Sequence, residues 1–225
     1  MIVWVTRDET ADGPLCTALR ARSLEVLLEP VLERRVVADP AEFLHELKPD
    51  DWLLLTSVYA IEAVAGNAEA KVPQVAVVGE SSRHAAERHG LRVALISPDG
   101  HGETLFARLR ESVHQGVVCY PRSAQAEVPE SWPGIELRAP VLYETVPRIF
   151  DRNAAKKAAI AAVASPSAVD ALGDLDIPLA SIGRTTSVAI CRHGRQPAVE
   201  APYPSFDHLA DAIANYLSDS RHHRA

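Results

Sequence analysis

Residues 56–64 read TSVYAIEAV, and a similar pattern returns at residues 164–172 as ASPSAVDAL. A second pair follows in the same order, VGESS at 78–82 and IGRTT at 182–186. The period of about a hundred residues is the length of a domain and exceeds that of a solenoid repeat. The sequence therefore predicts two similar lobes with a cleft between them, and clefts between domains commonly bind small molecules.

The order of apolar and amphipathic segments predicts an α/β fold in which each lobe has a parallel sheet flanked by helices. Short runs rich in Val, Ile and Leu alternate with amphipathic stretches, and fully apolar runs are typical of strands buried on both faces. The predicted strands are 2–6, 24–28, 52–56, 75–78, 92–96, 117–120, 135–138, 160–164, 179–182 and 198–200. The predicted helices are 12–22, 40–48, 58–66, 81–89, 102–115, 166–172, 185–193 and 205–218.

Two similar segments indicate where the chain passes between the lobes. EPVLE at residues 29–33 resembles APVLYE at residues 139–144, and both follow a predicted strand. If the chain crosses at both, the first lobe is discontinuous. The predicted parts are then a first lobe of 1–30 with 149–225, a second lobe of 36–140, and a two-stranded β linker of 31–35 with 141–148. Two sequential domains divided near residue 115 are the alternative.

The composition is that of an acidic globular protein. The 225 residues are 47% hydrophobic and carry a net charge of −7, so we do not expect a nucleic-acid-binding surface. Apolar runs such as 52–55 are too short to cross a membrane, and the N-terminus lacks the pattern of a signal peptide. Three cysteines without ligand spacing predict neither a metal site nor a disulfide framework. We therefore expect a cytoplasmic protein that binds no membrane.

Short motifs along the chain occur in the order found in one enzyme family. They are VTR at 5–7, PVL at 30–32, DWLLLTS at 51–57 with AIEA at 60–63, VVG at 77–79, PR at 121–122, VLYET at 141–145, ASPSAV at 164–169, IGRTT at 182–186, and Pro202 with Leu209. In this order the chain resembles the uroporphyrinogen-III synthases, over about residues 2–217.

The resemblance implies two α/β lobes, the first discontinuous, joined by a two-stranded ladder. It also implies a hydro-lyase that closes the linear tetrapyrrole polycarboxylate hydroxymethylbilane to uroporphyrinogen III, inverting ring D through a spiro intermediate. This step belongs to porphyrin and haem biosynthesis, and the family uses no cofactor and no metal. We expect a monomer whose only partner is this small-molecule substrate.

Tyr143 is the catalytic residue that the resemblance implies, because it matches the tyrosine of the family's VLYET-like motif. A phenol can donate a proton to the departing hydroxyl as a weak general acid, or hold that hydroxyl by a hydrogen bond. The alternative is a linker tyrosine that packs between the lobes with its hydroxyl in water.

The substrate's carboxylates need donors, and helix starts supply free backbone N–H groups beside hydroxyl side chains. Arginine suits carboxylates through its two-pronged guanidinium group. The predicted substrate-binding residues are Arg7, Ser57, Ser81, Ser82, Arg122, Ser165, Arg184, Thr185 and Thr186. Plain helix capping is the alternative for the hydroxyls, and solvation or an internal ion pair is the alternative for Arg7 and Arg122.

Three residues depart from those usual in the family. Tyr59 is a candidate to stack on a pyrrole or to cover the cleft, whereas Glu80 would repel a carboxylate. Arg184 opposes the helix dipole unless an anion is near. These departures keep an alternative function open, a cytoplasmic two-lobed sensor or a catalytically drifted relative that binds an anionic small molecule.

Overall fold

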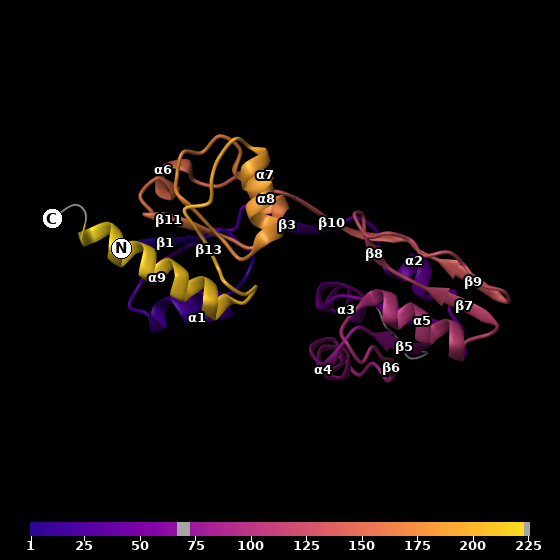
Figure 1. Cartoon of the computed structure of the whole chain (residues 1–225). Helices are drawn as coiled ribbons and strands as arrows, with labels where there is room; N and C mark the ends of the chain where they lie inside the picture. The colour runs from indigo at the N-terminus through magenta and orange to yellow at the C-terminus, as the bar shows by residue number, and fades with distance from the viewer. Residues whose placement is uncertain (67–72, 223–225) are drawn as a thin grey trace. The chain divides into compact units, whose positions relative to one another are not determined.

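The computed structural model describes residues 1–66 and 73–222 and divides the chain into two compact units (Figure 1). The first unit contains Met1–Glu33 and Val146–Ala225, and the second contains Arg34–Thr145. The chain passes from one unit to the other within strands β3 (Leu32–Val36) and β10 (Val141–Pro147).

The first unit is built on a five-stranded sheet of order β13-β12-β11-β1-β2, in which every pair is parallel. Its strands are β1 (Ile2–Val5), β2 (Glu25–Leu28), β11 (Ile160–Val163), β12 (Leu179–Ser181) and β13 (Val199–Glu200). Central strand β1 pairs on both sides, with Val3 opposite Ile160 of β11 and Val26 of β2. The fully apolar runs at β1 and β11 are therefore buried central strands, as predicted.

Helices cover both faces of this sheet, α1 and α9 on one face and α6, α7 and α8 on the other (Figure 1). They are α1 (Pro14–Ala21), α6 (Arg152–Ala155), α7 (Pro166–Leu172), α8 (Arg184–Arg192) and α9 (Phe206–His222). Successive side chains of a strand point to opposite faces. Val3 and Val5 accordingly pack in the cluster of α1 and α9, whereas Trp4 packs in that of α7 and α8.

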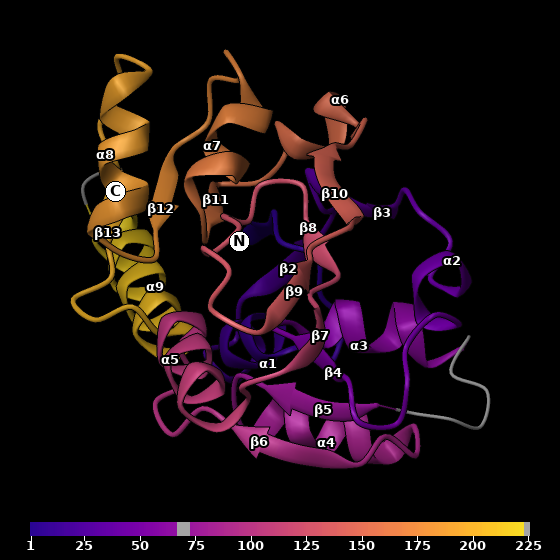
Figure 2. The ribbon, with the colours of Figure 1, turned by 90° about the vertical axis from the view of Figure 1, so that its right-hand side faces the viewer.

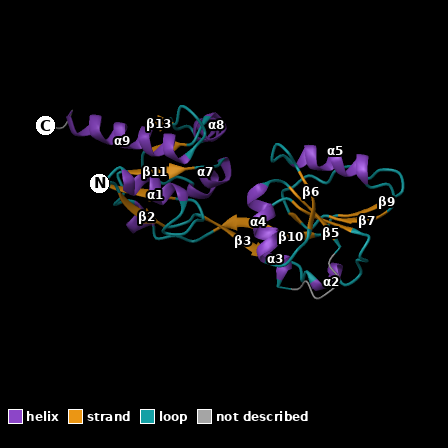
Figure 3. Ribbon diagram, turned by 90° about the horizontal axis from the view of Figure 1, so that it is seen from below, coloured by secondary structure: helices purple, strands orange, loops and turns teal. Residues whose placement is uncertain are grey.

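The second unit repeats this architecture with a five-stranded parallel sheet of order β6-β5-β4-β7-β9 (Figure 2). Its strands are β4 (Trp52–Leu55), β5 (Gln74–Val77), β6 (Val93–Ile96), β7 (Gly116–Cys119) and β9 (Ile135–Arg138). Helices α2 (Ala41–Leu44), α3 (Val58–Ala65) and α4 (Glu80–Arg88) cover one face, and α5 (Gly102–Ser112) covers the other (Figure 3). Leu53 and Leu55 face α3, whereas Leu54 faces α5. The predicted α/β fold with parallel sheets is confirmed.

A small third sheet of order β3-β10-β8 contains the two crossing segments. Beyond the two strands that were predicted, the short strand β8 (Arg122–Ser123) pairs with β10, with Arg122 opposite Val141 and Ser123 opposite Tyr143. Leu142 is fully buried in the apolar cluster under α3. This anchor sets the position of its neighbour Tyr143 in the second unit.

Local sequence explains several helix ends. Ser57 and Ser165 cap α3 and α7 as predicted, each accepting a backbone N–H three residues later. The predicted helix at 40–48 ends already at Leu44, because the Leu47 N–H bonds to the Leu44 carbonyl in a tighter turn and the Lys48 N–H bonds to the Asp51 carboxylate instead of a helical carbonyl. Helix α6 was not predicted; it is a single turn, capped by Asp151, and too short to show a periodic apolar pattern.

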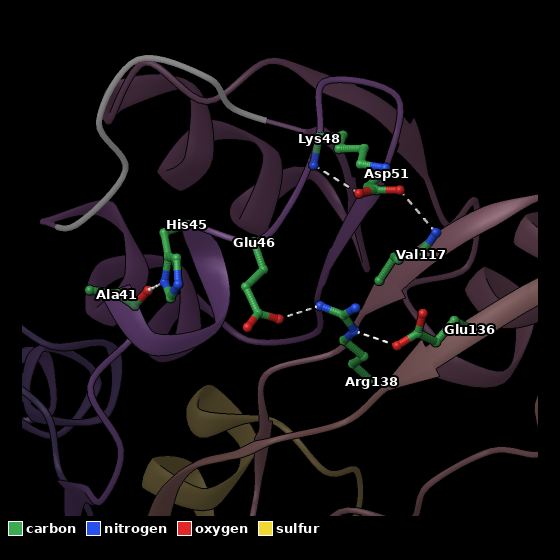
Figure 4. A network of polar contacts seen from close by, with 8 residues as sticks. All are labelled: Ala41, His45, Glu46, Lys48, Asp51, Val117, Glu136 and Arg138. Carbon is green, nitrogen blue, oxygen red and sulfur yellow. Dashed lines mark hydrogen bonds and ion pairs between the residues drawn. The ribbon is translucent and has the colours of Figure 1, made fainter.

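A buried carboxylate ties the start of β4 to its neighbour β7 (Figure 4). Asp51 is 5% exposed and accepts hydrogen bonds from the Lys48 N–H at 2.8 Å and the Val117 N–H at 2.9 Å. Close by, Arg138 forms ion pairs with Glu46 and Glu136. The aspartate that opens the DWLLLTS motif thus has a structural role that sequence reasoning missed. Among the described residues, none of the helices is long and apolar enough to span a membrane.

Candidate active site

Tyr143 lies on β10, half-buried, with both its ring and its hydroxyl in contact with the first turn of α3. The phenol oxygen is 3.1 Å from Ser57 Oγ. The ring meets the ring of Tyr59 edge-on, with centroids 4.8 Å apart and planes at 64°. Tyr143 therefore has a defined position within the second unit.

Ser57 stands at the carboxyl end of β4, where it caps α3. Its Oγ accepts a hydrogen bond from the Ala60 N–H at 3.1 Å. The adjacent Thr56 hydroxyl reaches the Tyr120 hydroxyl, beyond the end of β7, at 3.5 Å. The strand order reverses between β4 and β7, because β5 and β6 follow on one side of β4 whereas β7 and β9 lie on its other side. Ligands in α/β folds commonly bind at such a topological switch point. Ser57 and Tyr143 lie at this end of the sheet.

Tyr59 holds the other side of the Tyr143 ring. Its hydroxyl donates a hydrogen bond to the Arg34 carbonyl at 3.1 Å, and the Arg34 guanidinium lies over its ring, 5.0 Å from the centroid. Tyr59 thus connects α3 with β3 and β10. Sequence reasoning considered Tyr59 as a residue that stacks on a pyrrole or covers the cleft; it did not find the contact with Arg34, which lies 25 residues away in the chain.

The start of α4 offers one exposed hydroxyl. Ser81 is exposed, whereas Ser82 is 3% exposed and points into the core. Glu80 forms an ion pair with Arg83 of the same helix. The negative charge that would repel a carboxylate at this helix start is therefore partly compensated.

In the first unit, the starts of α7 and α8 place polar groups at the surface. Ser165 caps α7 by accepting the Ala168 N–H at 3.2 Å. Arg184 and Thr185 are exposed on the first turn of α8, whereas Thr186 is 2% exposed. The side chains available to a ligand at α8 are thus those of Arg184 and Thr185.

Arg7 is engaged within the first unit. Its Nη1 is 3.2 Å from Glu9 Oε2, and its guanidinium stacks 4.2 Å above the Phe206 ring. The other Glu9 oxygen accepts the Cys16 N–H at 2.7 Å, so this carboxylate supplies the cap that Gly13 cannot. Burial, together with the hydrogen bond and the charge of Glu9, raises the pKa of Cys16 to about 12. Sequence reasoning foresaw an internal ion pair as one alternative but did not identify Glu9.

Arg122 is likewise engaged, by main-chain carbonyl groups. Its Nε donates to the carbonyl of Ala139 at 3.2 Å, and its Nη1 donates to those of Ser123, Ala124 and Ala126 at 3.0 to 3.3 Å. These contacts fasten the segment after β8 to the segment that leads into β10. They support a structural role for Arg122, which helps to place Tyr143.

The structure therefore brings Ser57 and Tyr143 together and adds Tyr59 to them. Among the described residues, no group of three or more His, Cys, Asp or Glu side chains is arranged to hold a metal ion.

The family model described as uroporphyrinogen-III synthase HemD matches residues 14–211. The chain belongs to the uroporphyrinogen-III synthase family. Membership of this family makes it an enzyme of tetrapyrrole synthesis with a small-molecule tetrapyrrole substrate. A comparison with curated proteins finds no match.

Solved structures of uroporphyrinogen-III synthase from Thermus thermophilus also resemble this chain. A selenomethionine derivative of a triple mutant is 16% identical, with 97% of this chain and 99% of that chain covered and a TM-score of 0.48. The native wild-type enzyme in a second crystal form is 15% identical, with 98% and 99% covered and a TM-score of 0.42. A third structure is 16% identical, with 96% and 99% covered and a TM-score of 0.40. The family assignment rests on the family model.

Proposed function

We propose that this chain is a hydro-lyase that converts hydroxymethylbilane into uroporphyrinogen III and water, inverting ring D through a spiro intermediate. We further propose that it works in the cytoplasm as a monomer, without a cofactor, a metal or a nucleic-acid partner. The observation that carries the proposal is the placement of Tyr143, in a member of this family, with its hydroxyl against Ser57 at the ligand-binding end of a parallel sheet.

The chemistry begins with the loss of the hydroxymethyl oxygen. The pyrrole nitrogen supplies an electron pair, the C–O bond breaks, and Tyr143 donates a proton so that water leaves. The resulting protonated azafulvene, whose positive charge balances the phenolate of Tyr143, is attacked by a ring carbon of ring D that already carries a substituent, which forms the spiro intermediate. After ring D has been released and rejoined in the inverted sense, a pyrrole carbon loses a proton and Tyr143 is restored.

Selectivity comes from positioning, because the free azafulvene closes to the uninverted isomer. Holding reacting groups in one geometry can lower a barrier by several kcal/mol. We propose that substrate carboxylates bind the exposed groups Ser81, Arg184 and Thr185 and the hydroxyl of Ser165. Free backbone N–H groups at the starts of α4 and α8 would add donors beside the buried Ser82 and Thr186.

We propose no direct contact of Arg7 or Arg122 with the substrate. Their guanidinium groups are occupied by Glu9 and by main-chain carbonyls, so they would shape the binding loops rather than contact a carboxylate.

The test is an assay with freshly made hydroxymethylbilane, followed by separation of the product isomers. We expect the wild-type protein to form uroporphyrinogen III faster than the uninverted isomer forms without enzyme. The variant Tyr143→Phe should turn over about a hundredfold more slowly, the usual scale of general acid catalysis. Its far-UV circular dichroism and unfolding midpoint should match the wild type, because the ring contacts with Tyr59 are kept.

The matched control is Tyr203→Phe, which removes the hydroxyl of a tyrosine that is 66% exposed in the first unit. It should keep wild-type turnover. If the wild-type protein yields only the uninverted isomer, the proposed function is wrong. Wild-type turnover in Tyr143→Phe would instead remove Tyr143 from the mechanism.

A further inference from the structure

In the hydrogen bond between Ser57 and Tyr143, the Ser57 hydroxyl must be the donor once Tyr143 has lost its proton. A serine hydroxyl has one hydrogen and two lone pairs. One lone pair of Ser57 Oγ is already used, because it accepts the Ala60 N–H. The remaining contact, with the Tyr143 oxygen at 3.1 Å, can run either way in the resting protein.

Once Tyr143 has given its proton to the leaving group, the phenolate oxygen can only accept. At that moment the 3.1 Å contact is a hydrogen bond only if Ser57 is the donor. The Ala60 N–H that Ser57 accepts polarises the serine hydroxyl and strengthens its donation. A chain of donors thus runs from the first turn of α3 through Ser57 to Tyr143, and it stabilises the charge that develops on the phenol oxygen.

Tyr59 limits where the Tyr143 ring can lie. The Tyr59 ring packs edge-on against Tyr143, and its own hydroxyl is tied to the Arg34 carbonyl. A phenol donates well only when its oxygen is held within hydrogen-bond reach of the group that receives the proton. The packed ring of Tyr59 therefore keeps Tyr143 beside Ser57, and its hydroxyl bond to β3 keeps that ring in place.

We infer that Ser57 and Tyr59 are positioning residues for Tyr143. Ser57 donates its hydroxyl hydrogen to the Tyr143 oxygen and keeps that hydrogen covalently throughout, while Tyr59 fixes the ring, so that the Tyr143 proton is directed to the departing hydroxyl. This inference rests on the proposed function and assigns Ser57 a role different from that of a carboxylate ligand.

A double-mutant cycle tests the role of Ser57. Alone, Ser57→Ala should lower kcat about tenfold with little change in KM, because it removes one hydrogen bond to a developing charge. In the Tyr143→Phe background the same substitution should change kcat less than twofold. Ser57→Thr, which keeps the hydroxyl, should restore most of the activity.

The loss of a helix cap needs its own control, since Ser57→Ala also removes the cap of α3. Ser205→Ala removes the serine that accepts the His208 N–H at the start of α9 and has no tyrosine contact of this kind. It should lower the unfolding midpoint to a similar extent and leave kcat unchanged.

The role of Tyr59 is tested in the same way. Tyr59→Phe keeps the ring contact but loses the hydrogen bond to the Arg34 carbonyl, so kcat should fall about twofold, whereas Tyr59→Leu loses the ring contact as well and should lower kcat about fivefold. In the Tyr143→Phe background neither substitution should lower kcat by as much.

Equal losses from Ser57→Ala in both backgrounds would overturn the inference, because a carboxylate ligand or a purely structural residue acts independently of the phenol. No loss in either background would overturn it too. Both results leave the proposed function standing, provided that the wild type forms uroporphyrinogen III and Tyr143→Phe is slow. A wild-type protein that forms only the uninverted isomer would contradict both the proposed function and the inference on Ser57 and Tyr59.

Discussion

The buried carboxylate of Asp51 gives a quantitative test of what holds the second unit together. Asp51→Ala removes the acceptor of two N–H groups, those of Lys48 and Val117. A hydrogen bond to a charged group contributes about 1.5–3 kcal/mol net. Lys48 is exposed, so water can replace its bond, whereas Val117 is half-buried. We therefore expect the free energy of unfolding to fall by about 3 kcal/mol.

Urea unfolding followed by circular dichroism measures the loss, and hydrogen exchange with mass spectrometry shows where it arises. Protection should fall in peptides from 34–145 and not in those from 1–33. Asp50→Ala, at the exposed neighbouring position, should change stability by less than about 0.5 kcal/mol. Asp51→Asn keeps one acceptor and should lose about half as much as Asp51→Ala. Equal midpoints for Asp51→Ala and Asp50→Ala would refute the reasoning.

Three further outcomes are expected. Burial raises the pKa of Cys16 and of Cys119 from 9.0 to about 12, so both thiols ionise first in the unfolded state. Stability should therefore fall above pH 9, by up to about 1.4 kcal/mol per pH unit and thiol, and urea midpoints should fall less steeply in Cys119→Ala. The exposed Cys191 should react at once with a disulfide reagent, and the two buried thiols only at the rate of unfolding; fast reaction of all three would contradict this. Arg122→Met should speed hydrogen exchange in 122–126 and lower kcat, and unchanged exchange would show that its carbonyl contacts are dispensable.

The elements that could be predicted from the sequence are those with a strong local signal. Central strands β1, β4 and β11 are apolar runs buried on both faces, and the caps Ser57 and Ser165 stand immediately before their helices. Strand β8 has only two residues, so no alternation of side chains could reveal it.

The partners of the site residues were harder to predict, because the chain brings distant segments together. Ser57 and Tyr143 are 86 residues apart, and nothing in the local sequence around either residue indicates that the two are in contact. The phase of a helix also decides exposure, since Ser81 faces solvent while its neighbour Ser82 faces the core. Only the three-dimensional structure shows which hydroxyl of such a pair is accessible.

The interrupted first unit has a consequence for how this protein is made. During synthesis, residues 34–145 emerge as one uninterrupted block and can fold as soon as they leave the ribosome. Strand β1, by contrast, has a partner on one side only until β11 at Ile160–Val163 has been translated. Strand β1 thus belongs to the unit that is completed second, and its apolar IVWV segment stays paired on one side only while more than a hundred further residues are translated.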